Sequence, residues 1–276
     1  MPQVQAVEVK RAFSSRSLWI ALAVGAIVVA VHALSHVIPD SRAYIAGWGG
    51  RTHTLEYPLS LYEVWLGARP GRPEGQVFFL LLPLLAALPY GTSFLEDRSS
   101  GYVAGIVTRA ARGRYYAAKS VAVFLAGGVA VTLPLLLDFA VTALFFPALA
   151  PEPVTGTFPL RGDSLGGDLF YSQPLAYVLL SLVVLFLWSG LIGCLTVPLA
   201  YLVSNRIVVV LIPFALYLFL EFGADALSVL QYSPMTFLRP DQAVSANLPV
   251  LTVGWLALAV VVAAFLAWRA RVDETL

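Results

Sequence analysis

Two histidines have the clearest spacing for chemistry in this chain. His32 and His36 lie four residues apart, so a helix would place both on one face, a spacing that suits a shared metal ion. Their place at the end of an apolar segment also suits an aromatic-belt or interface role, which is the interpretation we favour, and no metal site is predicted. No catalytic residue can be assigned, and we do not expect the chain to be an enzyme.

A second chemical signal is a near match to a phosphate-binding loop. Residues 113–120 read GRYYAAKS, which fits GxxxxGK[ST] except that Ala118 replaces the second glycine. A phosphate loop needs a preceding strand and freely twisting glycines, so that backbone N–H groups can hold phosphate. Here the segment opens an apolar helix, so we interpret the match as chance and expect no nucleotide or other cofactor in this chain.

Two acidic residues fall inside apolar segments. A charge at the bilayer centre costs about 2.5–3.5 kcal/mol on the insertion scale. Asp138 is expected near the outer surface, and Glu221 deeper, in the outer half. The candidate substrate-pathway residues are Glu221, Phe222 and Tyr217. Residues 222–225 could break the helix, so Glu221 either lies at the base of an outer vestibule or caps a broken helix.

The composition identifies the elements that must position these residues. The 276 residues are 59% hydrophobic and 12% charged, against about 25% charged in a soluble domain. A bilayer core about 30 Å thick needs roughly 20 apolar residues in a helix. The sequence therefore predicts an all-α integral membrane protein, a single transmembrane domain over 1–276, with six spans near 18–38, 77–95, 116–146, 174–203, 207–230 and 248–268.

Charge asymmetry predicts the topology. The N-terminal segment, the 96–119 loop, the turn at Arg206 and the C-terminal tail hold 11 of the 17 Lys and Arg residues. Basic loops are expected in the cytoplasm, so both termini are predicted to be cytoplasmic. The basic residues can also bind anionic lipid headgroups. The net charge of +1 gives no sign of a nucleic-acid partner, and none is expected.

Other features concern helix shape and the outer loops. The third and fourth spans exceed the bilayer thickness, and Pro134 and Pro198 are natural kink points. The larger loops, 39–76, 149–173 and 231–247, are expected on the outer side as a compact cap. Within the first of them, 59–67 is predicted as a short surface helix.

The most informative stretch is the polar, arginine-rich loop from Glu96 to Ser120. Ser99 or Ser100 can cap a short helix near 98–107. Its apolar positions fall at helical spacing and form one face: Tyr102, Val103, Ile106 and Val107. A short amphipathic helix with flanking arginines is typical of a docking element on the cytoplasmic surface.

These residues resemble the permease subunits of type 2 ABC exporters. Residues 7–13 (VEVKRAF) are similar to the amphipathic surface helix that precedes the first span in that family. The loop is similar to the family's acidic–glycine–Thr/Ser-Arg-x-x-Arg-x-x-Tyr-x-x-x-Lys pattern, through Glu96, Gly101 or Gly105, Thr108-Arg109, Arg112, Tyr115 or Tyr116, and Lys119. The resemblance covers the whole chain in topology and is specific only over 96–119.

The resemblance implies a function and partners. The loop helix would be a coupling helix that fits a groove on a separate ABC ATPase subunit, which would carry the ATP and Mg²⁺. The implied ATPase-coupling residues are Glu96, Arg98, Tyr102, Val103, Ile106 and Arg109. A second permease, identical or related, would complete the pathway in a bacterial plasma membrane. The substrate is expected to be a hydrophobic or amphipathic peptide, lipid or drug-like molecule.

Three alternatives remain open at this point. A secondary transporter would show mid-membrane ionisable sites and an inverted repeat, and the sequence shows few of the former and none of the latter. A permease-like subunit that transmits force without moving cargo would account for the large outer loops. A helix that only binds lipid headgroups would also be rich in arginine.

Overall fold

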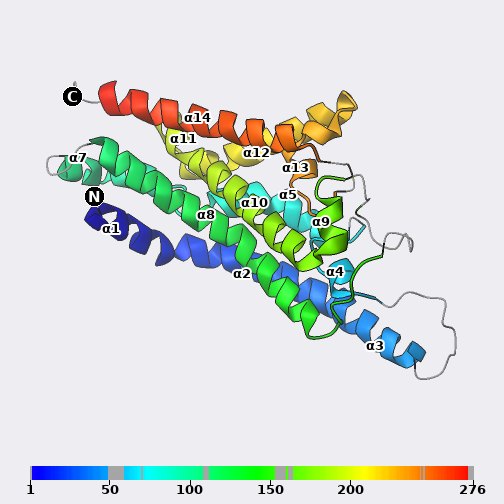
Figure 1. Cartoon of the computed structure of the whole chain (residues 1–276). Coiled ribbons are helices and arrows are strands. Elements are labelled where there is room, and N and C mark those ends of the chain that lie inside the picture. The colour runs from blue at the N-terminus through cyan, green and yellow to red at the C-terminus, as the bar shows by residue number, and fades with distance from the viewer. Residues whose placement is uncertain are drawn as a thin grey trace.

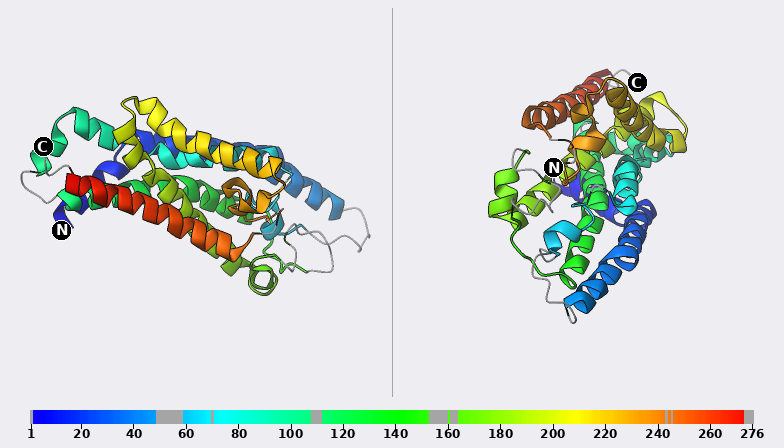
Figure 2. Two further views of the ribbon diagram at one scale, coloured as in Figure 1. Left: turned by 90° about the horizontal axis from the view of Figure 1, so that it is seen from above. Right: turned by 90° about the vertical axis from the view of Figure 1, so that its right-hand side faces the viewer.

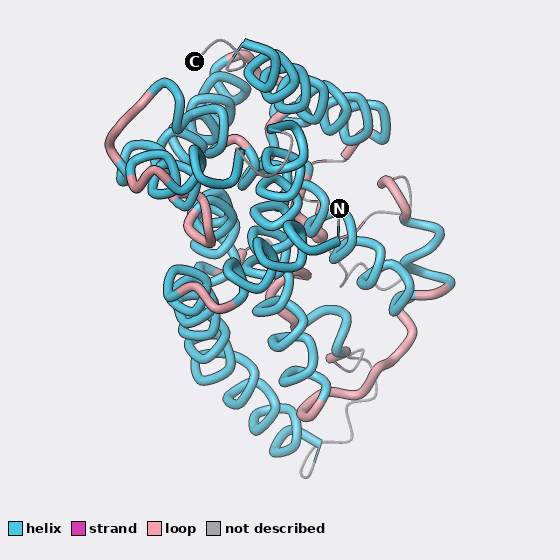
Figure 3. Tube along the Cα trace, turned by 90° about the vertical axis from the view of Figure 1, so that its left-hand side faces the viewer, coloured by secondary structure: helices cyan, strands magenta, loops and turns pink. Residues whose placement is uncertain are grey.

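The computed structural model describes residues 2–48, 59–69, 71–107, 112–152, 160, 164–242, 244 and 246–272. Regular structure in these residues is entirely helical, as the composition predicted (Figure 3). Figures 1 and 2 show one elongated bundle with different short helices at its two ends. At the inner end, named after the charge-based topology, lie α1 (Pro2–Phe13), α7 (Tyr102–Val107) and the end of α14 (Leu248–Val272). At the outer end lie α3 (Ile38–Trp48), α4 (Leu61–Val64), α9 (Gly167–Ser172) and α13 (Pro234–Phe237).

Within the described residues, five helical stretches are long and apolar enough to cross a membrane, so the chain is a multi-pass membrane protein by helix length and hydropathy. The stretches run over Arg16–Ala46, Gly113–Ala143, Pro174–Leu202, Arg206–Ala226 and Leu248–Val272. The first combines α2 (Arg16–His32), a π-helical turn η1 (Ala33–Val37) and most of α3. The second lies in α8 (Arg112–Ala143). The first helix therefore extends well beyond its predicted end at residue 38.

The predicted span at 77–95 differs from the structure. Its helix, α5 (Pro73–Ala87), has 15 residues, or about 22 Å at 1.5 Å per residue, which is less than a bilayer core. The chain then turns at Pro89 and Tyr90, whose φ of 62° is left-handed. Leu88, before the proline, keeps helical φ and ψ of −62° and −45°. The chain leaves the helix at Pro89, which has no N–H to donate, and at Tyr90. The run of apolar residues used for the prediction continues through this turn, so the predicted length of the span was too great.

The predicted loop helix at 98–107 is two helices. α6 (Ser93–Ser99) and α7 are joined through Gly101, whose φ of 75° is left-handed and favours glycine. Ser99 and Ser100 end the first helix rather than capping the second, because both hydroxyls bond back to carbonyls of α6. The short helix of the prediction therefore begins at Tyr102.

The predicted surface helix at 59–67 is buried instead. Only four residues are helical, as α4, and the segment is inserted into the outer end of the bundle. Trp65 is 1% exposed and packs edge-on against Phe139 of α8. Tyr62, Trp65 and Leu66 share a core cluster with residues of α5 and α8. Burial of apolar and aromatic side chains of this size in the bundle stabilises the fold more than exposure on its surface would.

The fourth predicted span is one apolar stretch with a break. α10 (Pro174–Cys194) and α11 (Thr196–Leu202) meet at Leu195. Pro198 lacks the N–H that would bond to the carbonyl of Cys194, so the break falls there. Pro134, the other predicted kink point, lies inside α8, which the structure assigns as a continuous helix. α12 (Arg206–Ala226) continues past Glu221, so the predicted break at 222–225 is absent.

Two close approaches at glycines hold the bundle together. A Cβ at Gly25 of α2 would lie 2.4 Å from Cγ of Pro134, so α2 and α8 touch there. A Cβ at Gly127 or Gly193 would lie 2.7 Å from the carbonyl oxygen of Ala86, so α8 and α10 both press against α5. Helices that meet at glycine pack their backbones closely, as membrane helices commonly do.

Candidate functional site: an inner charge cluster

The first element of the site is α1, which packs along α8 at the inner end. Glu8 is fully buried on the face of α1 that meets the bundle, and Arg11 follows one turn later. After α1 the chain turns at Ser15, whose hydroxyl accepts a hydrogen bond from the backbone N–H of Leu18 and caps α2. This capped junction fixes α1 against the start of the first membrane helix.

The centre of the site is Lys119 of α8, whose side chain is fully buried. Its Nζ lies 2.6 Å from Oδ2 of Asp97 in α6 and 3.0 Å from Oε2 of Glu8. Nζ also lies 3.2 Å from the hydroxyl of Tyr90. Arg11 donates to Oδ1 of Asp97 at 2.8 Å and to Oε1 of Glu8 at 2.9 Å. We call these residues, with Tyr115, the inner charge cluster.

Charges and hydrogen bonds in the inner charge cluster are balanced. Two carboxylates face one ammonium and one guanidinium, so the four charges sum to zero. Tyr115 donates to Asp97 at 2.7 Å, and Tyr90 donates to Glu8 at 2.7 Å. Every carboxylate oxygen therefore accepts at least one hydrogen bond, which buried charges need.

Local electrostatics keep Asp97 and Tyr90, which lie outside the membrane helices, in the protonation states that these hydrogen bonds require. Burial raises the pKa of the Asp97 carboxyl, but the hydrogen bond from Arg11 and the charge of Lys119 together bring it below its usual value. Burial and the hydrogen bond to Glu8 raise the pKa of Tyr90, so it stays a neutral donor. At neutral pH Asp97 is a carboxylate that accepts three donors.

The inner charge cluster connects the α6–α7 loop to two other elements. Asp97 of α6 binds both Arg11 of α1 and Lys119 of α8. On its other side α6 packs on α11, where the Phe94 and Tyr201 rings lie 4.9 Å apart. The loop is therefore attached to α1, to α8, which forms the second membrane stretch, and to α11, and displacement of the loop would be passed to them.

The predicted ATPase-coupling residues occupy two environments. Glu96 and Arg98 are exposed, Glu96 at 3.2 Å from Arg206 and Arg98 over the Tyr201 ring. Tyr102 and Val103 are half-buried. The Arg11 guanidinium lies 4.6 Å from the Tyr102 ring, and Val103 packs on the inner core. Their side chains thus contact the protein itself. The side chain of Ile106 and all of Arg109 lie outside the described residues.

The predicted pathway residues do not converge. Tyr217 is buried and donates to the backbone carbonyl of Phe79 in α5 at 3.2 Å. Glu221, one turn later, accepts hydrogen bonds from Ser233 and from Thr236, which follow α12. Phe222 is 67% exposed. Of the two interpretations, these contacts favour the structural one, in which Glu221 holds the chain that turns back after α12.

An outer pair was not predicted as a pair. His32 Nδ1 lies 2.7 Å from Oδ1 of Asp138, and both side chains are buried. From the sequence, His32 was expected at an interface and Asp138 near the outer surface, with no contact predicted between them. His36, 25% exposed, lies 3.2 Å from Glu74 instead. No three His, Cys, Asp or Glu side chains among the described residues are grouped as metal ligands would be.

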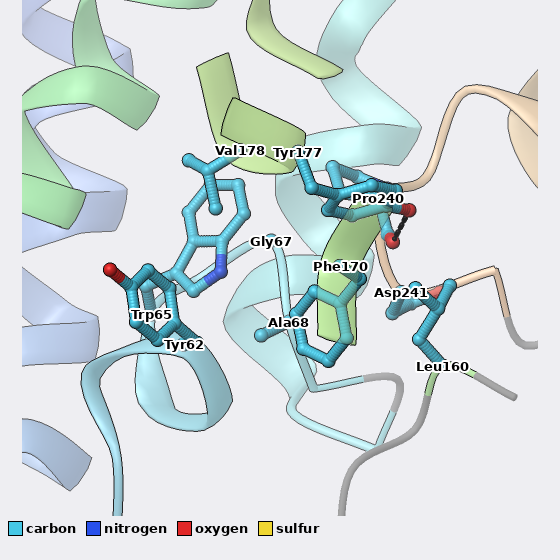
Figure 4. Close-up of a pocket in the computed structure, with 10 residues that line it drawn as sticks. All are labelled: Tyr62, Trp65, Gly67, Ala68, Leu160, Phe170, Tyr177, Val178, Pro240 and Asp241. Atoms are coloured by element: carbon cyan, nitrogen blue, oxygen red, sulfur yellow. Dashed lines mark hydrogen bonds between the residues drawn. The ribbon is translucent and has the colours of Figure 1, made fainter. Parts of the chain in front are cut away.

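A small cavity lies beneath the outer end (Figure 4). Its walls include Trp65, Phe170 and Tyr177, and Tyr177 donates to the carbonyl of Pro240 at 2.7 Å. The volume of about 10 Å³ is close to the space one water molecule needs, so this cavity does not hold a substrate.

Ser164 belongs to a Gly-x-Ser-x-Gly sequence over residues 162–166, a motif that was wrongly taken to be absent from the sequence. In hydrolases this motif exposes the serine on a strand-to-helix turn. Here Ser164 is 6% exposed and precedes the short helix α9, in a described region without strands. Gly162 and Asp163 lie outside the described residues. This setting gives Ser164 no nucleophile geometry.

No protein-family model, no curated protein and no solved structure matches this chain. The geometry of the inner charge cluster, and of the loop that it holds, is therefore what indicates a function for this chain.

Proposed function

We propose that this chain is the membrane subunit of an ATP-driven exporter of the type 2 ABC class, powered by a separate ATPase that docks on the α6–α7 loop. The observation that carries the proposal is the inner charge cluster, in which buried Lys119 and Asp97 join the loop to α1 and α8. A loop that receives force must be attached rigidly to the helices it moves. Buried, fully bonded charges provide that attachment.

The docking surface in this proposal is the outward face of the loop rather than the face predicted from its apolar spacing. Tyr102 and Val103 contact α1 and the inner core, so they set the position of α7. Arg98, Ser99, Ser100 and Gly105 are exposed and form the surface that is open to a partner. Cargo would be a hydrophobic or amphipathic molecule that moves between this chain and a second permease.

One observation favours a second candidate. A buried ionisable pair between two membrane helices, here His32 of α2 and Asp138 of α8, is typical of proteins that couple transport to ions or protons. A secondary transporter would work without an ATPase, so one experiment separates the two.

The experiment is purification of the tagged full-length chain from its native membranes in mild detergent, with ATP hydrolysis measured on the eluate. Gly105→Trp adds a large side chain to the exposed face of α7, where an added Cβ meets no atom of the described residues within 4 Å. Gly223→Trp is the matched control at the outer end of α12, with equally open space. Both variants should insert normally.

We expect a stoichiometric ATPase with the parent chain and with Gly223→Trp, and at least a tenfold loss of bound ATPase with Gly105→Trp. Equal ATPase binding by both variants would show that α7 is not the docking element. A parent chain that elutes alone and transports only with a proton gradient would establish the secondary transporter instead.

A further inference from the structure

The outer pair joins three elements that are distant in sequence. Oδ1 of Asp138 in α8 lies 2.7 Å from Nδ1 of His32 in α2. Its other oxygen, Oδ2, accepts the backbone N–H of Leu66 at 2.6 Å. Asp138 is fully buried and His32 is 1% exposed. One carboxylate therefore holds the inserted segment 59–69 against α8 while it also binds α2.

The local backbone of α2 is unusual at this place. The π-helical turn η1 begins directly after His32 and ends at Val37. π-helical turns inside α-helices occur frequently at functional sites. This turn changes the phase of the helix between His32 and His36, so the two rings, 6.0 Å apart, reach different acidic partners. His32 is directed to the buried carboxylate and His36 to the partly exposed edge of the bundle.

The charge state of the pair depends on one proton. Both carboxylate oxygens of Asp138 take part in hydrogen bonds, Oδ1 with His32 and Oδ2 with the N–H of Leu66. With neutral His32, ionised Asp138 is an uncompensated charge in the bundle, and isolated buried charges are costly. A proton on His32 neutralises this charge. Imidazole is the side chain that takes up or releases a proton most readily near neutral pH.

We propose that His32 and Asp138 form a binding site for a proton from the aqueous phase at the outer end, and that its occupancy sets how tightly segment 59–69 is held against α8. With the proton bound, the ion pair is complete and the Leu66 N–H stays on Asp138. Without it, the carboxylate is better solvated by water, and the segment detaches more often. Partly exposed His36 marks the edge from which protons reach the site. This inference does not depend on the proposed function.

The other charged and titratable groups of the elements packed here have their own partners. Arg72 binds Asp40 of α3 at 2.6 Å, and Arg69 binds Glu63 of the inserted segment at 2.7 Å. Glu74 of α5 lies against His36, and Tyr62 packs on Phe139. Of these groups, His36 is the other imidazole, so it is the group that the test must separate.

The test is hydrogen–deuterium exchange of the full-length chain in detergent, read by mass spectrometry on peptides covering residues 61–69. Rates at pH 5.5 and pH 8.5 are divided by the intrinsic exchange rates at each pH. In the parent chain we expect protection of this segment to fall by about tenfold or more at the higher pH, since a buried pair then loses its compensating charge.

Three variants decide the outcome. His32→Asn keeps a donor near the Nδ1 position but cannot bind the proton, so protection should be low at both pH values. Asp138→Asn is neutral and still accepts from Leu66, so protection should not change with pH, and it provides the test if His32→Asn does not fold. His36→Asn is the matched control and should keep the full pH response. A response that survives in His32→Asn or Asp138→Asn, or that disappears in His36→Asn, would overturn the proposal.

Discussion

Replacing Lys119 with methionine tests how much the inner charge cluster stabilises the fold. The substitution keeps most of the side-chain volume and removes the ammonium. Buried Glu8 and Asp97 then keep one cation, Arg11, which forms an ion pair with each of them. Removing one partner from a buried ion pair costs about 3–5 kcal/mol, because the remaining charge is uncompensated.

The expected change in unfolding temperature follows from that energy. At roughly 2–4 °C per kcal/mol for a chain of this size, the unfolding temperature should fall by about 6–20 °C. The assay is intrinsic fluorescence during heating of the purified protein in one detergent, at neutral pH. Because membrane proteins often unfold irreversibly, all variants are compared at the same heating rate.

The matched variant removes one charge of each sign. Lys119→Met combined with Glu8→Gln leaves the Arg11–Asp97 pair and restores a net charge of zero. Replacing both members of a buried pair with neutral groups is often close to neutral. We therefore expect the double variant to regain more than half of the lost unfolding temperature. The reasoning is refuted if Lys119→Met melts within about 2 °C of the parent, well short of the loss expected above, or if the effects of the two substitutions simply add.

Two further predictions concern acid stability and helix packing. Because its neighbours hold the pKa of Asp97 below the usual value, Asp97 stabilises the fold at neutral pH, and this stabilisation is lost as the pH falls below about 4. Asp97→Asn should lower the unfolding temperature at pH 7 and flatten its fall with acid, as measured by melting from pH 7 to 3. Gly25→Ala should cost about 1–3 kcal/mol by pushing α2 off Pro134. Gly223→Ala, in open space, should not destabilise the chain, and equal melting of the two would contradict the close approach.

The helices of the membrane region could largely be predicted from hydropathy, and their interruptions could not. Five of the six predicted spans coincide with helical stretches long enough to cross a membrane. At 77–95 the apolar count continued through Pro89 and Tyr90, where the backbone turns. Counting apolar residues measures transfer to lipid, whereas the end of a helix depends on backbone geometry at individual residues.

The burial of two predicted surface segments could not be predicted from the sequence either. Segment 59–67 has the composition of an amphipathic surface helix, yet Trp65 and Leu66 lie in the core of the bundle. Tyr102 and Val103 show the apolar spacing of a docking face, but they pack on the protein itself. Periodicity identifies an apolar face, and it does not say whether the same chain or a partner covers that face.

The candidate site could be predicted only in part, for the same reason. Asp97 and Lys119 both belong to the polar loop over 96–120, which was expected on the cytoplasmic surface. Their partner Glu8 lies 111 residues from Lys119, and His32 lies 106 residues from Asp138. A single sequence gives no pairing over such separations. One signal was available: an acidic and a basic residue on the first, amphipathic helix need partners if that helix packs on the bundle.

Both charged sites involve the same helix, and this links the two ends of the bundle. Lys119 and Asp138 are 19 residues apart on α8, or about 28 Å along its axis. Between them α8 is continuous and contacts α2 at the Gly25–Pro134 approach. A helix packed this closely moves as one body rather than bending freely. Displacement of the loop through Asp97 and Lys119 would therefore reach Asp138, which holds segment 59–69. The proposed ATPase, bound at the inner end, should thus alter exchange protection of residues 61–69. A proton at His32 should in return alter the affinity of the chain for the ATPase, since coupling between two sites is reciprocal in their binding free energies.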